Sequence, residues 1–74
     1  MKYVIVTDNQ GEESPILFPE CIPHYCAVNN LRTVVVSAGF CWKEDGKWIA
    51  SGMSESLHKN SRPEDSELIQ RYFK

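Results

Sequence analysis

The sequence predicts a small α+β domain: an antiparallel sheet of about four strands, in the order ββαββα, with the C-terminal helix packed on one face. Three observations lead to this prediction. β-Branched and aromatic residues gather in two pairs of short segments, a polar turn joins each pair, and an apolar stripe at helical spacing lies near the C-terminus. Because the chain has only 74 residues, we expect a single domain over residues 1–74.

The N-terminal segment is predicted to form a hairpin. Residues 2–8 are rich in β-forming side chains, and the polar run 8–13 contains Gly11 and predicts a turn. Residues 16–18 form a second, short strand. Pro15 cannot donate a hydrogen bond to a neighbouring strand, so this second strand is expected at an edge of the sheet.

A short helix over residues 22–31 is expected next, with Pro23 tolerated in its first turn. The clearest strand follows over residues 33–42, where apolar residues alternate. Asp45-Gly46 suits the positive dihedral angles of a type I′ turn, and residues 48–53 complete a second hairpin.

The register of this second hairpin determines its two faces. A two-residue turn pairs Trp42 with Ile49, whereas a three-residue turn would pair Trp42 with Trp48; the first gives the cleaner apolar face. That face carries Val34, Val36, Ala38, Phe40, Trp42, Ile49 and Met53. The opposite face carries the small residues Ser37, Gly39, Cys41, Ala50 and Gly52, and either faces solvent or is covered by a helix or a second subunit.

A C-terminal helix is expected over residues 61–73, after a polar loop over residues 54–62. Ser61 and Glu64 match a capping box around Pro63. The apolar stripe consists of Leu68, Ile69, Tyr72 and Phe73. We expect this stripe to cover the apolar face of the second hairpin.

The cysteines raise the question of a metal site. Cys21, His24 and Cys26 lie within six residues, and Cys41 could complete a Cys₃His zinc set. The spacing matches neither a Cys-x₂-Cys nor a His-x₃-His pair, and an odd number of cysteines indicates free thiols. We therefore expect no metal and no cofactor, and a small zinc-binding module remains the alternative.

Charge, length and motifs disfavour three functional classes. The formal net charge is −2 and basic residues stand beside acidic ones, which disfavours nucleic-acid binding. No apolar run approaches the roughly 20 residues of a membrane span and no leader is evident, so we expect a cytoplasmic protein without membrane contact. The segment Gly52-Met53-Ser54-Glu55-Ser56 resembles a nucleophile elbow, but it lacks the second glycine and the chain is too short for that fold. We expect no enzymatic activity.

Protein interaction is the remaining class. The chain has three Phe, three Tyr and two Trp, more aromatic residues than one small core readily hides, and Tyr25, Trp42 and Trp48 are candidates for partial exposure. The partner would be another protein or a second copy, as in a homodimer. The candidate interaction residues are Ser37, Gly39, Trp48, Ala50, Gly52, Ser54, Ser56, His58 and Arg62.

Several segments carry a resemblance. They are Leu-Phe-Pro-Glu (17–20), His24, Val-Val-Val-Ser-Ala-Gly-Phe (34–40), Gly-Met-Ser-Glu-Ser-Leu (52–57) and Ser-Arg-Pro-Glu-Asp-Ser-Glu-Leu-Ile (61–69). Together they resemble a group of small uncharacterised proteins of tailed phages and prophages of Gram-negative bacteria, which has no assigned activity. The resemblance implies a small accessory protein that binds a host or phage protein, for instance to modulate a host process or a defence system. A self-associating structural component is the alternative.

Overall fold

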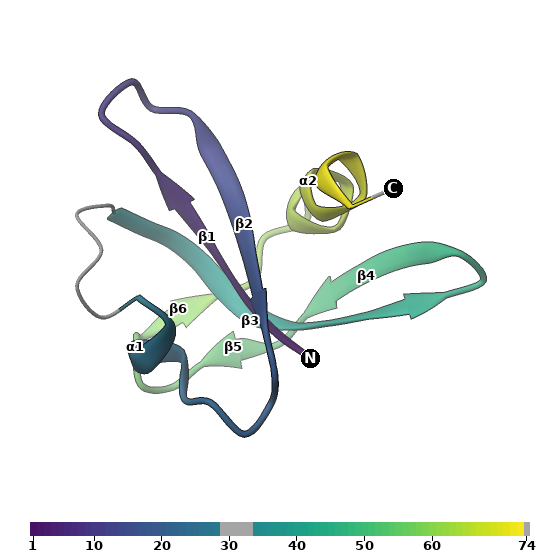
Figure 1. The fold of residues 1–74 in the computed structure, drawn as a ribbon, viewed down its shortest axis with the longest axis horizontal. Coiled ribbons are helices and arrows are strands. Elements are labelled where there is room, and N and C mark those ends of the chain that lie inside the picture. Colours follow the sequence, from purple (N-terminus) through teal and green to yellow (C-terminus); the bar gives the residue numbers. More distant parts are fainter. Residues whose placement is uncertain (29–33, 74) are drawn as a thin grey trace.

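The computed structural model describes residues 1–28 and 34–73, which form an α+β domain (Figure 1). In chain order its elements are β1 (Lys2–Thr7), β2 (Glu13–Phe18), α1 (His24–Ala27), β3 (Val34–Glu44), β4 (Lys47–Ser51), β5 (Met53–Ser54), β6 (Lys59–Asn60) and α2 (Asp65–Tyr72). An antiparallel sheet has the strand order β2-β1-β3-β4, and β5 and β6 form a separate two-stranded ribbon. The predicted fold class is confirmed, but the ββαββα order is not matched, because α1 is short and a third hairpin precedes α2.

Helix α1 is much shorter than the predicted helix over residues 22–31. It covers only His24–Ala27, directly after Pro23, whose extended backbone cannot belong to the helix. Val28 then leaves the helical region with φ −109° and ψ 3°. β-Branched residues are poor helix formers, which agrees with an end at this position. The remainder of the predicted helix, from residue 29 on, lies outside the described residues.

The first hairpin confirms the expected edge strand. β2 pairs only with β1 and forms one edge of the sheet, with Pro15 opposite Ile5. The connecting turn is held by Asp8, whose Oδ1 accepts hydrogen bonds from the backbone N–H groups of Gln10 at 2.8 Å and Glu12 at 3.0 Å. Local side-chain acceptors of this kind are the reason why aspartate favours turns.

The second hairpin has the expected register. Trp42 pairs with Ile49 and Glu44 pairs with Lys47, so the loop consists of Asp45 and Gly46. Both loop residues have positive φ values, 50° and 79°, as a type I′ turn requires.

A β-bulge in β3 breaks the strict alternation that the sequence predicted. Ile5 pairs with Ser37 and the next residue of β1, Val6, pairs with Val35, so Val36 is left without a partner in β1. Val35 therefore packs with Ala38 on one side of the sheet, while Val36 packs on the other side. The prediction that Val36 and Ala38 share one apolar face is therefore wrong.

Two apolar clusters lie on opposite faces of the sheet. The first consists of Tyr3, Ile5, Cys41, Leu68 and Ile69, with Leu17, Val36, Trp48 and Ala50 packed against it. The second consists of Val4, Val6, Phe18 and Ala38, with Ile16, Ala27, Val28, Val35 and Leu57 packed against it. α2 therefore belongs to the first cluster, whereas α1 and the loop after β5 cover part of the second.

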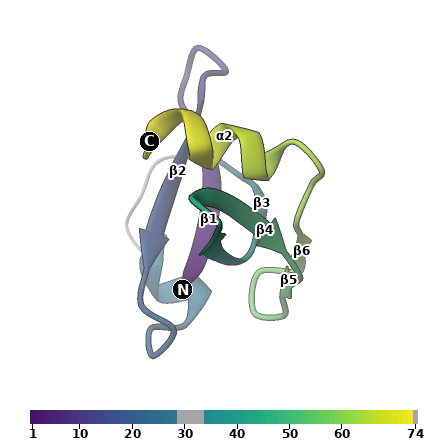
Figure 2. The same cartoon turned by 90° about the vertical axis from the view of Figure 1, so that its right-hand side faces the viewer.

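Helix α2 lies on the face opposite to the predicted one. It contacts β2 and β4, lies between the two long hairpins (Figure 1) and runs across the strands (Figure 2). Leu68 and Ile69 pack beside Cys41 and Ala50, on the face of small residues. Small side chains allow a helix to approach the sheet closely, which a face with Phe40 and Trp42 would not.

Helix α2 also protects an edge of the sheet. The backbone N–H groups of Trp48 and Ala50 on edge strand β4 donate to Gln70 Oε1 at 2.9 Å and to Ser66 Oγ at 2.8 Å. Covering such donors blocks pairing with a strand of another chain.

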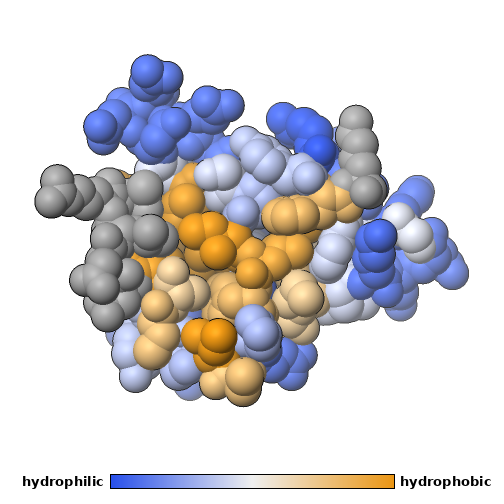
Figure 3. Space-filling model, viewed as in Figure 1, coloured by the Kyte–Doolittle hydropathy of each residue, from blue (hydrophilic) through white to orange (hydrophobic). Residues whose placement is uncertain are grey.

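Apolar and hydrophilic residues occupy different parts of the surface. Apolar residues gather over the middle of the face shown in Figure 3, between the hydrophilic tips of the two long hairpins.

Within residues 1–28 and 34–73, no helix has the length and apolar character needed to cross a membrane.

Gly39 provides a test of the close packing between β3 and the chain that leaves β4. A Cβ atom at this position would lie 2.6 Å from the carbonyl oxygen of Ser51. We expect Gly39→Ala to lower the free energy of unfolding by about 1–3 kcal/mol, measured by urea denaturation.

Gly46→Ala is the comparison variant. A Cβ at Gly46 meets nothing within 4 Å, and only its φ of 79° opposes a side chain, so the expected loss is about 1 kcal/mol. A smaller loss for Gly39→Ala than for Gly46→Ala would contradict the close approach.

Candidate functional site

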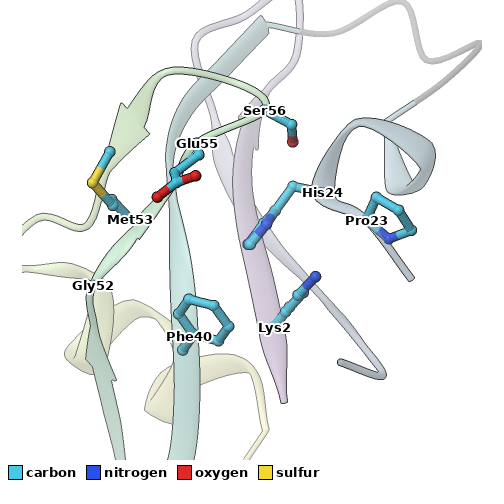
Figure 4. A pocket seen from close by; sticks show the side chains of 8 residues that line it. All are labelled: Lys2, Pro23, His24, Phe40, Gly52, Met53, Glu55 and Ser56. Atoms are coloured by element: carbon cyan, nitrogen blue, oxygen red, sulfur yellow. The ribbon is translucent and has the colours of Figure 1, made fainter. Parts of the chain in front are cut away.

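An open hollow lies on the face of the sheet that α2 does not cover (Figure 4). Its volume is about 510 Å³, and eight residues line it: Lys2, Pro23, His24, Phe40, Gly52, Met53, Glu55 and Ser56. They come from β1, the start of α1, β3 and the segment that follows β4. A concave site with apolar walls and a few polar groups is the usual form of a binding site. We call it the Phe40 hollow.

His24 forms one wall of the Phe40 hollow. Its side chain is buried, and Nε2 donates a hydrogen bond to the carbonyl oxygen of Gly39 at 2.8 Å. The ring packs edge-to-face against Phe18 and Phe40, with centroid distances of 5.3 Å and 5.7 Å. His24 therefore ties α1 to the sheet and holds the Phe40 ring in place. No pattern in the sequence indicates this role of His24, because its hydrogen-bond partner is the backbone carbonyl of Gly39, 15 residues away in the chain.

Two opposite charges flank the hollow. The ammonium group of Lys2 donates to the carbonyl oxygen of Ile22 at 3.2 Å. The carboxylate of Glu55 forms no hydrogen bond or ion pair within the described part of the chain. In the view of Figure 4, the two side chains stand apart with the His24 ring between them, and Phe40 lies to one side.

Large apolar side chains are exposed beside and within the hollow. Phe40, Trp42 and Met53 are 38%, 42% and 45% exposed, and Ile49, paired with Trp42, is half-buried. Phe40 and Trp42 lie two residues apart on β3 and therefore share a face. We call these four residues the Phe40 patch. No described helix covers this patch, since α2 packs on the opposite face.

The predicted interaction residues do not gather at one surface. Ser37, Gly39 and Ser54 are buried, and Trp48 and Ala50 pack beneath α2. His58 is exposed in the turn after β5, with φ 54°, and Arg62 belongs to an ion network. Only Gly52 and Ser56 line the Phe40 hollow.

The hydroxyl groups of Ser54 and Ser56, in the segment that resembles a nucleophile elbow, have local hydrogen-bond partners. Ser54 Oγ accepts a hydrogen bond from the backbone N–H of Leu57 at 3.3 Å and lies 3.4 Å from Ser56 Oγ. Such bonds are typical of serine in a turn. The residues predicted from the sequence to form the interaction surface did not include Lys2, Phe40 or Glu55, which line the hollow. The alternation along β3 did place Phe40 and Trp42 on one face, but that face was expected to lie beneath the helix.

The proposed zinc ligands are not brought together. Cys21 and Cys26 are exposed, His24 points into the second cluster, and Cys41 is buried on the other face beneath α2. Desolvation raises the pKa of the Cys41 thiol, as expected for a core cysteine. Among the residues that the structure describes, no three His, Cys, Asp or Glu side chains are placed to hold one metal ion. The alternative of a zinc-binding module is therefore not supported by the arrangement of these residues.

A network of polar side chains lies on the α2 side. The buried Tyr3 hydroxyl donates to Asp65 Oδ2 at 2.6 Å, and Asp65 also accepts from the backbone N–H and the Nε of Arg62, both at 2.9 Å. Burial raises the pKa of Tyr3, and the bond to Asp65 raises it further. Because Tyr3 and Asp65 are fully buried, no substrate reaches them. Their arrangement is structural.

Arg62 extends the network to the first hairpin. Its two terminal nitrogens donate to the carboxylate of Glu13 at 2.8 Å and 3.0 Å, in a bidentate pair. The hydrogen bonds to Glu13 raise the pKa of Arg62, and in return the hydrogen bonds from Arg62 lower the pKa of Glu13. The predicted Ser61–Glu64 capping box is wrong: α2 begins at Asp65, and the Asp65 carboxylate reaches back to the N–H of Arg62.

Comparisons with family models, curated proteins and solved structures find no match to this chain. The resemblance to small phage and prophage proteins therefore stays a prediction.

The Glu13–Arg62 ion pair predicts that the free energy of unfolding falls at acidic pH. Its lowered pKa keeps Glu13 ionised in the folded state at a pH where the unfolded chain has begun to bind a proton, below the ordinary value of 4.5. Stability from this pair is therefore present above that value and declines as the pH falls through the lowered pKa.

Urea unfolding at about pH 7 and about pH 3.5 tests this. We expect Glu13→Gln to lose less stability than the wild type between the two conditions, by up to about 1 kcal/mol because water partly screens the pair. Glu67→Gln, at an exposed position, should behave as the wild type. Equal losses in all three proteins would contradict the assignment.

Proposed function

We propose that this protein is a non-enzymatic binding protein that contacts another protein through the Phe40 patch and the adjoining hollow. The observation that carries this proposal is the exposure of Phe40, Trp42 and Met53 on the face that α2 leaves open. Aromatic residues beside a pocket are frequent energetic anchors of interfaces. Monomeric proteins seldom leave such a group of large apolar side chains in water without a use.

The polar groups of the chain favour binding over catalysis. The hydrogen-bonded pair of Tyr3 and Asp65 is fully buried. In the Phe40 hollow, one ring nitrogen of His24 is occupied by the Gly39 carbonyl. Lys2 and Glu55 stand apart, with the His24 ring between them in the view of Figure 4. This arrangement recognises charge at two separate points and does not activate a nucleophile.

The biological setting follows from the resemblance in the sequence. We infer that the protein is a phage-type accessory protein that acts in the cytoplasm of an infected bacterial cell. There it would bind a host or phage protein and modulate a host process or a defence system. Its size agrees with such a role, since one exposed face is sufficient for a regulatory contact.

Site-specific photo-crosslinking in Gram-negative bacterial cells tests the binding surface. A benzophenone amino acid at position 42 should give covalent protein adducts, because Trp42 lies in the Phe40 patch. The same amino acid at position 71, exposed on α2, should give none. Adducts at both positions, or at neither, would count against the Phe40 patch as the binding surface.

A further inference from the structure

We propose that the protein bound at the Phe40 patch seats an arginine side chain in the Phe40 hollow, against the ring of Phe40 and the carboxylate of Glu55. The inference rests on the proposed function, because it uses the same surface and names the chemistry that the partner brings to it. The remainder of the Phe40 patch would contact apolar residues next to that arginine.

Glu55 brings the negative charge of the hollow. Within residues 1–28 and 34–73, its carboxylate forms no hydrogen bond or ion pair. In the view of Figure 4, the carboxylate lies between Met53 and His24, with the Phe40 ring below it. A partner that covers the hollow removes water from this carboxylate, which costs free energy unless the partner supplies a positive charge.

The neighbouring polar groups of the hollow have bonds of their own. The ammonium group of Lys2 donates to the Ile22 carbonyl at 3.2 Å, and Nε2 of His24 donates to the Gly39 carbonyl at 2.8 Å. In its neutral form the His24 ring has no second N–H group, so it cannot donate to Glu55. The donor that complements Glu55 therefore has to come from the partner.

The Phe40 ring favours a flat cation. The ring is partly exposed and is held edge-to-face by His24, with 5.7 Å between the two centroids. The face of an aromatic ring attracts a cation that lies against it. A guanidinium group can stack on such a ring and donate two parallel hydrogen bonds to a carboxylate, whereas an ammonium group is a compact point charge. Arginine thus fits Phe40 and Glu55 better than lysine does.

Trp42 and Ile49 extend the contact beyond the hollow. Trp42 follows Phe40 by two residues on the same face of β3, about 7 Å along the strand. An extended partner segment presents every second side chain at the same spacing. An arginine in the hollow therefore brings an apolar residue two positions away against Trp42. The formal net charge of −2 favours the approach of such a basic segment.

A peptide titration tests the recognition of charge. The probe is acetyl-Ser-Arg-Ser-Leu-Ser-amide, added to isotope-labelled protein and followed by nuclear magnetic resonance. We expect shifts at Phe40, Trp42 and Glu55 with a dissociation constant of about 1 mM. Replacing the arginine of the peptide by citrulline, which has the same shape without the charge, should raise this constant at least about tenfold.

Matched protein variants locate the charge that is recognised. Glu55→Gln should raise the dissociation constant of the arginine peptide at least about fivefold, because it removes the charge and keeps the size of the side chain. Glu67→Gln makes the same change at an exposed position of α2, on the opposite face, and should shift the constant by less than about twofold.

Photo-crosslinking in Gram-negative bacterial cells applies the test to the partner itself. With the benzophenone amino acid at position 42, Glu55→Gln should reduce the protein adducts at least about fivefold, and Glu67→Gln should leave them unchanged. Mass spectrometry of the wild-type adducts should find an arginine within about three residues of the crosslinked position in the partner.

The outcomes separate this inference from the proposed function. Adducts at position 42 that Glu55→Gln leaves unchanged, or that carry no arginine nearby, would keep the proposed function and overturn the inference. A peptide that does not bind, or that binds equally well with citrulline, would also overturn the inference. The absence of adducts at position 42, or adducts that join two copies of this chain, would overturn both.

Discussion

The carboxylate of Asp65 joins three elements of the fold. It accepts hydrogen bonds from the Tyr3 hydroxyl on β1 and from the backbone and guanidinium of Arg62, which in turn binds Glu13 on β2. A buried carboxylate without partners is strongly destabilising, so α2 can be seated only where all these bonds form together. This condition places α2 on the face that holds Tyr3 and Cys41.

The position of α2 determines what the other face can do. Because Leu68 and Ile69 pack on the small-residue side, Phe40 and Trp42 keep their exposure on the opposite side. The same helix binds the outer N–H groups of β4, so this edge is closed to other strands. One packing choice thus protects an edge and leaves an apolar face open for contact.

The local features of the fold could be predicted from the sequence, but the face of the sheet on which α2 packs could not. Asp45-Gly46 and Pro15 determine a turn and an edge through their own backbone preferences. The bond between Tyr3 and Asp65 spans 62 residues, and no periodic pattern indicates it. The bulge at Val36 likewise reverses the alternation of β3 without a sequence signal. The predicted site residues Ser37 and Gly39 lie in the interior because small size favours close packing as much as surface contact.

The Phe40 hollow is built from parts that the core already holds in place. His24 is bound to the Gly39 carbonyl and flanked by Phe18 and Phe40, so the wall of the hollow belongs to the second apolar cluster. A preformed surface loses little conformational entropy on binding, which favours affinity for its size. Binding a partner there would also stabilise the folded state, because only the folded chain assembles Lys2, Phe40 and Glu55. Because the two apolar clusters of this domain are small, binding at the open face would raise its free energy of unfolding.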